Sequence, residues 1–223
     1  KPIEKDWTAA LKRLSQVAAT SPKASIVRWG SYFAPEAARG LWRAGVAPQA
    51  DPVGLLARAF DGADAVSFLD RTLAVDLATY LPGDLLVKAD RMAMAHGLEG
   101  RSPLLDHVLA EWAARLPVGL KVRGRTGKYL LRKAFADLLP PEVTAQGKQG
   151  FGVPVGKWLR GGLAAWSREL LLGGIAAKRY FRPEEIARLL DEHAKGREDH
   201  GKRLWALAAL ELWLRRFAPG GDI

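Results

Sequence analysis

The sequence predicts an all-α protein, and three observations favour this class. Apolar residues recur at helical steps along most of the chain, as Trp7, Leu11 and Leu14 do near its start. Proline and glycine stand where such patterns begin and end. Strand character is scarce, because only residues 25–27 and 119–122 combine into short extended pieces.

The helices are predicted in chain order from their apolar faces and their end signals. The expected ranges are 7–17, 35–43, 52–60, 64–81, 84–96, 105–116, 129–139, 158–172, 183–195 and 202–217. Asp6 and Asp51 are suited to begin the helices that follow them. Pro82 is expected to end the helix over 64–81, and Gly97 to cap the C-terminal end of the helix over 84–96.

Composition places the chain among ordinary folded proteins. It has 223 residues, of which 48% are hydrophobic and 26% charged, and we expect one mostly helical domain or domain fragment over residues 1–223. A boundary is expected near residue 50 or near residue 117. Neither a membrane span nor a signal peptide is expected, which makes the cytoplasm the default location. The chain has no cysteine, which excludes disulfides, cysteine-ligated metals and a thiol nucleophile.

The net charge of +10 is concentrated in one glycine-rich region. Residues 117–160 hold nine cations against two acids, Asp137 and Glu142. The cations are Lys121, Arg123, Arg125, Lys128, Arg132, Lys133, Lys148, Lys157 and Arg160. Such a region suits a solvated basic face, a phosphate or pyrophosphate site, or nucleic acid. The sequence does not favour nucleic acid, because it lacks a ribonucleoprotein motif, zinc-finger spacing and a helix-turn-helix pattern.

Several common catalytic signatures are absent. His96, His107, His193 and His200 form no metal-binding pattern, so we expect no metal site. The sequence contains no glycine pattern of a nucleophilic serine, no GxxxxGK[ST] loop and no GxGxxG turn.

The segment over residues 80–106 is unusually rich in charges. Asp84, Lys88 and Arg91 share one face of a predicted helix, where Asp84 and Lys88 form an ordinary i,i+4 pair. Further charged residues surround the loop that follows this helix; they are Glu99, Arg101 and Asp106. A salt-bridged surface helix explains this pattern, and so does a network that faces a ligand.

This segment resembles the signature of the asparagine synthetase family, in the C-terminal part of its synthetase domain. The family pattern is roughly YLP-D-LL-K-DR-SMA---E-R-PFLD, and this chain matches it from Tyr80 to Asp106. The departures are Ala93 for serine, Gly100 for a larger small residue and Leu104 for phenylalanine.

A second block follows in the same order as in the family. Residues 121–132 resemble K-----GK-LLR, and residues 147–159 resemble the loop R-K-GF--P---WL. Gln146 stands where the family usually has arginine. The motif-bearing core of the resemblance covers residues 76–160.

The resemblance implies an ATP-dependent amide ligase of asparagine biosynthesis. In members of that family the aspartate carboxylate attacks ATP, with Mg²⁺, at its α-phosphorus, and ammonia from glutamine then attacks the acyl-adenylate. Lys148 is implied as the catalytic lysine. Lys128 and Gly150 are implied on the ATP and pyrophosphate side, with Arg132 as a further cation. The residues implied to organise the site are Asp90, Arg91, Glu99, Arg101 and Asp106.

The resemblance also implies that much of the family machinery lies elsewhere. We expect an all-α, helical portion of an adenine-nucleotide α-hydrolase-like domain, without the nucleotide-binding α/β part, the SGGxDS pyrophosphate loop and the glutaminase. Such a portion should not catalyse the full reaction alone. The sequence leaves open the oligomeric state, a homodimer included, and the carboxylate, since a β-lactam synthetase or lasso-peptide cyclase shares these motifs. A non-catalytic basic module that binds nucleic acid would also explain the charge pattern, and a scaffold domain would explain motifs that serve packing alone.

Overall fold

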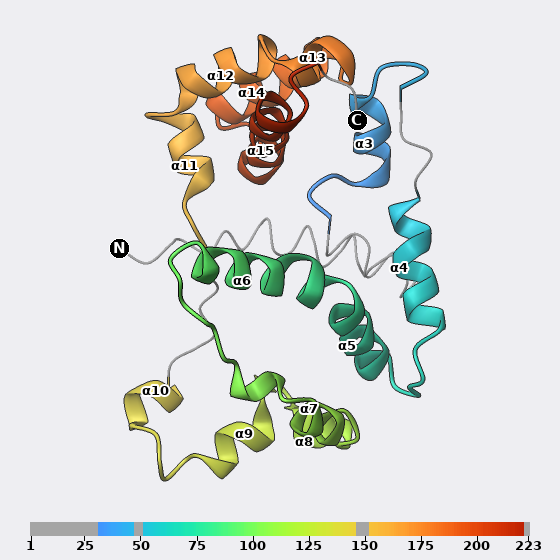
Figure 1. Ribbon diagram of the computed structural model, residues 1–223, viewed down its shortest axis with the longest axis vertical. Coiled ribbons are helices and arrows are strands. Elements are labelled where there is room, and N and C mark those ends of the chain that lie inside the picture. The colour runs from blue at the N-terminus through green and yellow to red at the C-terminus, as the bar shows by residue number, and fades with distance from the viewer. Residues whose placement is uncertain (1–30, 47–50, 146–151, 221–223) are drawn as a thin grey trace. The chain divides into compact units, whose positions relative to one another are not determined.

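The computed structural model describes residues 31–46, 51–145 and 152–220, which form mostly helices joined by short connections (Figure 1). The chain divides into two compact units, each of which is described by itself. Unit 1 comprises residues 1–26 and 52–149, and unit 2 comprises residues 27–51 and 150–223. The chain therefore passes between the units at 26/27, 51/52 and 149/150, and the second of these divisions is next to the expected boundary near residue 50.

Unit 2 consists of six described helices around a common core. They are α3 (Pro35–Leu41), α11 (Val155–Arg160), α12 (Ala164–Leu172), α13 (Ile175–Arg179), α14 (Pro183–Ala194) and α15 (Gly201–Phe217). Helix α15 lies among α11, α12, α13 and α14 (Figure 1). Its Leu204 and Leu214 are fully buried, as is Ile186 of α14. Burial of these side chains supplies the main stabilising free energy of the unit.

A buried carboxylate joins α15 to α13. Glu211 is fully buried and accepts hydrogen bonds from the backbone N–H groups of Ile175 (3.0 Å) and Ala176 (2.9 Å). Arg215 donates a third bond, from Nε to Oε1 at 2.7 Å. A Cβ atom at Gly174 would lie 2.3 Å from Cδ of Glu211, so only glycine permits this approach. The first turn of α13 thus receives its hydrogen-bond acceptors from α15.

The segment after α3 is held against α13. Trp42 pairs with Phe181 in an isolated antiparallel bridge, and their rings lie 4.7 Å apart. Arg43 donates from Nε to the Phe181 carbonyl (2.9 Å) and from Nη2 to the Ala177 carbonyl (2.8 Å). Residues far apart in sequence therefore close one side of the core.

Unit 1 has a longer series of short elements. They are α4 (Pro52–Asp61), α5 (Phe68–Ala78), the π-helix η1 (Leu81–Leu86), α6 (Val87–Met94), the 3₁₀-helix η2 (Pro103–Leu105), α7 (His107–Ala114), α8 (Val118–Lys121), β1 (Val122–Arg123), β2 (Thr126–Gly127), α9 (Tyr129–Ala134) and α10 (Pro141–Ala145). Helices α4 and α5 pack together, with the rings of Phe60 and Phe68 5.8 Å apart. The strands β1 and β2 form a two-residue antiparallel pair.

The helical character expected from the sequence is confirmed, and several details are wrong. Residues 119–121 belong to α8 rather than to a strand, while Val122 begins β1, because a four-residue segment is too short to distinguish the two periods. Pro82 does not end the helical path, since it lies in the first turn of η1, where its missing N–H is tolerated. The expected helix over 158–172 is two helices that are separated at Gly161 and Gly162. The predicted strand at 25–27 lies outside the described residues.

The bonds of Glu211 predict a large effect on stability. We expect Glu211→Gln to lower the free energy of unfolding by about 1–3 kcal/mol, because the amide leaves one buried donor without an acceptor. Urea denaturation followed by circular dichroism measures this. The matched variant Glu184→Gln, on the exposed side of α14, should cost less than about 1 kcal/mol. Equal stability of the two variants would contradict the role of Glu211.

Candidate functional site

The first motif segment forms η1 and α6 of unit 1. A π-helix is rare and occurs often at functional positions, which distinguishes this segment from the helices around it. Lys88 pairs with Asp84 across one turn, with Nζ 3.7 Å from Oδ1, as the i,i+4 spacing predicts. Both side chains are more than half exposed, so the pair adds little to stability.

Asp90 and Arg91 lie on α6 with exposed side chains. Within the described part of the chain, neither side chain has a hydrogen-bonded or ionic partner. Adjacent helical residues point in different directions, which explains why the two do not pair with each other. The charged groups of both side chains are therefore exposed on the surface of α6.

The loop after α6 is shaped by Gly97, whose φ of +68° needs no Cβ. Its N–H donates to the Met94 carbonyl, and Leu98 N–H donates to the Ala93 carbonyl, both at 3.0 Å. This is a Schellman motif, so the predicted C-terminal cap is confirmed. It turns the chain into the loop that carries Glu99.

The charged residues of this loop have local partners. Glu99 Oε1 and Arg101 Nη2 lie 2.5 Å apart in an exposed ion pair. Asp106 begins α7, because its Oδ1 accepts the N–H of Leu109 at 3.1 Å. These contacts order the loop and leave its charged groups open to solvent.

Lys121 of the second motif block is a structural cation. Its Nζ donates to Asp70 Oδ1 of α5 (2.6 Å) and to the Ala114 carbonyl (2.7 Å), and it is 13% exposed. The Lys121 hydrogen bond, followed by that of the Ser67 hydroxyl, holds the pKa of Asp70 below its usual value. The pair ties α5 to α8, and the ammonium of Lys121 is engaged by Asp70 and by the Ala114 carbonyl.

Lys128 has an unusual backbone conformation. It precedes α9 with φ +54° and ψ +38°, and it is the one non-glycine residue with positive φ in the described part of the chain. The left-handed region costs an L-residue about 1–2 kcal/mol. The strained turn places Lys128 directly before the helix that carries Arg132.

Lys148 and Gly150 lie outside the described residues. The other predicted site residues are Asp90, Arg91, Glu99, Arg101, Asp106 and Lys128. The predicted site residues that the structure describes therefore all belong to unit 1.

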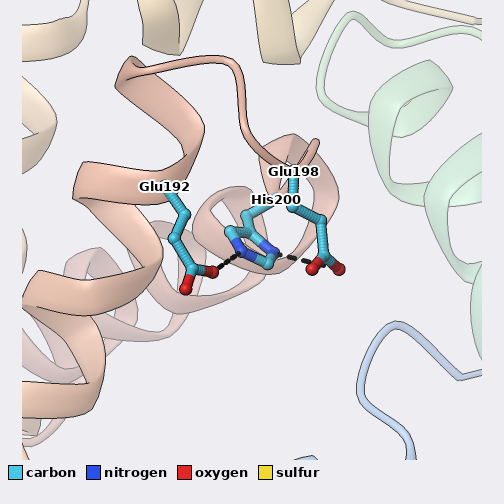
Figure 2. Close-up of side chains that lie close together, drawn as sticks. All are labelled: Glu192, Glu198 and His200. Atoms are coloured by element: carbon cyan, nitrogen blue, oxygen red, sulfur yellow. Dashed lines mark hydrogen bonds and ion pairs between the residues drawn. The ribbon is translucent and has the colours of Figure 1, made fainter.

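A second cluster, which the sequence did not predict, lies in unit 2. The imidazole of His200 is 1% exposed and has Glu192 at one ring nitrogen and Glu198 at the other (Figure 2). Its Nε2 lies 2.7 Å from Glu192 Oε2, and Nδ1 lies 3.8 Å from Glu198 Oε1. The hydrogen bond from His200, followed by that from Arg188, lowers the pKa of Glu192.

This cluster is arranged for hydrogen bonding rather than for holding a cation. Arg203 Nη1 lies 3.0 Å from His200 Nδ1, and a guanidinium only donates, so Nε2 carries the proton toward Glu192. Arg188 donates to both oxygens of Glu192, and Arg203 pairs with Glu198 at 3.3 Å. One ligand atom from each of Glu192, Glu198 and His200 lies within 4.8 Å of the others, but the two arginines already occupy these atoms as donors (Figure 2).

The cations of the basic region over residues 117–160 do not all extend into solvent. Lys121 is paired, Arg123 donates to the Tyr129 hydroxyl at 2.7 Å, and Arg160 donates to the His193 carbonyl at 2.9 Å. These cations hold local structure, which weakens the interpretation of the whole region as one basic face for nucleic acid. No described helix has the length and apolar character that crossing a membrane requires.

Comparisons with known proteins agree with the motifs. The family model described as asparagine synthase matches residues 5–215. A protein of Mycobacterium bovis that carries the name of a glutamine-hydrolysing asparagine synthetase is 42% identical over 140 residues, which are 62% of this chain and 21% of that protein. Asparagine synthetase (glutamine-hydrolysing) 1 of Bacillus subtilis is 33% identical over 154 residues, 69% of this chain and 24% of that protein. No solved structure matches significantly.

The chain spans between a fifth and a quarter of the length of these two relatives. A shorter match, to the asparagine synthetase of Gallus gallus, is 42% identical over 69 residues, 30% of this chain and 12% of that protein.

The Asp70–Lys121 pair predicts a pH-dependent contribution to stability. Because the pKa of Asp70 is lowered on folding, the contribution is full above about pH 4, the usual aspartate pKa, and is lost as the pH falls through the lower folded-state value. We expect Asp70→Asn to cost about 1–2 kcal/mol at pH 7 in urea denaturation, and progressively less below pH 4. The exposed Asp64→Asn is the matched control. A cost of Asp70→Asn that does not change with pH would contradict the assignment.

Proposed function

Since this chain belongs to the asparagine synthase family, we propose that it is the helical C-terminal portion of an ATP-dependent, glutamine-hydrolysing asparagine synthetase. The observation that carries the proposal is the family match over residues 5–215. The two motif blocks, over 80–106 and 121–159, stand in family order and support it. The proposed substrates are aspartate, ATP and glutamine, the last as the source of ammonia.

In the proposed reaction an aspartate carboxylate oxygen bonds to the α-phosphorus of ATP, and pyrophosphate leaves. Ammonia then bonds to the acyl carbon and displaces AMP, which leaves the amide. Negative charge on the phosphoryl oxygens and on the departing pyrophosphate needs a positioned cation. We assign this role to Lys148 by its place in the motif, with Lys128 as a further cation and Gly150 allowing close backbone approach.

The exposed charged residues of α6 and of the loop after it are suited to organise the active site rather than to take part in the reaction. Asp90 and Arg91 lack partners in the described part of the chain, and Glu99 and Arg101 pair only with each other. We propose that these residues organise the active-site wall. Asp106 does so indirectly, because it begins α7 behind the loop.

We further propose that the parts that hold MgATP and hydrolyse glutamine lie in polypeptide beyond this chain. The relatives are four to five times as long as their matched regions, which supports this. The burial of apolar side chains in unit 1 also supports this proposal. Among the described residues of unit 1, only Phe60 and Val75 are buried hydrophobic residues. Large apolar side chains such as Met92, Leu98 and Leu104 are more than half exposed, as expected of a surface that packs against more protein.

A related adenylating enzyme that acts on another carboxylate is the second candidate. Gln146, in place of the arginine usual in the family, is the observation that favours it. Comparison of aspartate with β-amino acid and peptide carboxylates in a pyrophosphate-release assay separates the two activities.

The role of Lys148 predicts a selective loss of activity. In the complete protein that carries this chain, Lys148→Ala should lower the rate of amide synthesis by at least about 100-fold, as expected when charge stabilisation is removed from a transition state. Glutamine hydrolysis should stay unchanged. Lys195→Ala, an exposed lysine of unit 2, is the matched control and should retain both activities. Normal synthesis by Lys148→Ala would remove Lys148 from the mechanism.

A further inference from the structure

One arginine of α15 holds the segment that leads into α3. Arg203 donates from Nε to the backbone carbonyl of Tyr32 at 3.0 Å, and its guanidinium carbon lies 5.9 Å from the centre of the Phe33 ring. Phe33 in turn packs against the buried core of unit 2. Arg203 therefore keeps residues that are 171 positions away in the sequence next to the start of α15.

Arg203 is itself oriented by His200. Its Nη1 lies 3.0 Å from His200 Nδ1 and 3.3 Å from Glu198 Oε1. On the other side of the ring, His200 Nε2 carries the proton and lies 2.7 Å from Glu192 Oε2 (Figure 2). Nδ1 accepts from Arg203 only while the imidazole is neutral, because a protonated imidazole donates from both of its nitrogens.

The imidazole of His200 has little room to move. Its own backbone N–H donates to Nδ1 of His193 at 3.2 Å. The next residue, Gly201, lies against α11, because a Cβ at Gly201 would be 2.5 Å from Cα of Gly156. His200 is 1% exposed, whereas the side chain of Arg203 is 27% exposed. When the contact between the two breaks, Arg203 is therefore the group that moves.

We infer that the contact between Arg203 and His200 is an acid-sensitive switch: a proton taken up from solvent at Nδ1 releases Arg203 and the segment before α3. Two donors then face each other across this contact, and Glu198 Oε1, 3.8 Å from Nδ1, accepts the new N–H instead. Glu192 stabilises the resulting cation from the other ring nitrogen. The switch depends on contacts within unit 2 and not on the proposed function.

The other charged groups near this cluster do not replace Arg203 at Nδ1. Within the described residues, the side chains that approach Nδ1 of His200 are Arg203 and Glu198. Hydrogen bonds from His200 and then from Arg188 lower the pKa of Glu192, so this carboxylate stays charged as the pH falls toward 5. The remaining charged or titratable groups face Arg188, His193 or the Tyr32 ring; they are Glu185, Asp199, Arg160 and Lys202.

Hydrogen–deuterium exchange of the complete protein that carries this chain tests the switch. Mass spectrometry follows residues 32–41 between about pH 7.5 and about pH 5, where histidine ordinarily changes its charge, with rates corrected for intrinsic amide exchange. We expect protection of this peptide to fall at least about tenfold in the wild type, because an opening coupled to one proton grows up to about tenfold per pH unit. Peptides of α12 should keep their protection, which distinguishes local release from unfolding of the unit.

His200→Gln takes up no proton in this interval, so its protection of residues 32–41 should not change with pH. Arg203→Gln lacks the anchor, and its protection should be low at every pH. The matched control is His107→Gln, at an exposed histidine of unit 1, which should behave as the wild type does.

Constant protection of residues 32–41 in the wild type, an equal loss in His200→Gln, or a parallel loss in α12 would overturn the inference. If His200→Gln does not fold, Arg203→Gln decides. Low protection that is independent of pH in that variant supports the switch, and protection that still falls with pH excludes it.

Discussion

The backbone contact between Gly156 and Gly201 is the constraint on which the described part of unit 2 depends. It brings α11 onto α15 closely enough for His193 to reach the Gly156 carbonyl, and it leaves His193 and His200 inside the unit. Buried polar groups of this kind are stable only when every donor and acceptor has a partner. The buried carboxylate of Glu211, farther along α15, also has its hydrogen-bond partners, because it accepts the first N–H groups of α13.

The two units differ in how they use their apolar residues. Unit 2 buries a continuous core that runs from Leu41 to Ala218, whereas the described part of unit 1 buries little beyond Phe60 and Val75. Unit 1 holds its elements by polar contacts instead, such as Lys121 with Asp70 and the Asp106 cap of α7. A unit with a buried core, together with a unit whose described apolar side chains are largely exposed, is consistent with the proposed portion of a larger synthetase.

Sequence patterns predicted the helices well where an end signal accompanied the apolar period, as Pro35 and Gly97 show. They were wrong for residues 119–121, because so short a segment has no distinguishable period. His193 has helical spacing from Ile186, Leu189 and Leu190, which indicates that it faces the core. Its contact with Gly156 joins residues 37 positions apart and has no local signal. Residue chemistry alone left Lys148 as one cation among nine, and only the family motif selected it.

Transfer of oxygen from the carboxylate to AMP tests the proposed chemistry most directly. The complete protein that carries this chain is supplied with aspartate labelled with ¹⁸O in its side-chain carboxylate, together with ATP and glutamine. If the carboxylate attacks the α-phosphorus, each AMP that is released contains one labelled oxygen, because ammonia displaces AMP by cleavage of the acyl C–O bond. Release of unlabelled AMP, or of ADP with labelled phosphate, would contradict adenylation and with it the role proposed for Lys148.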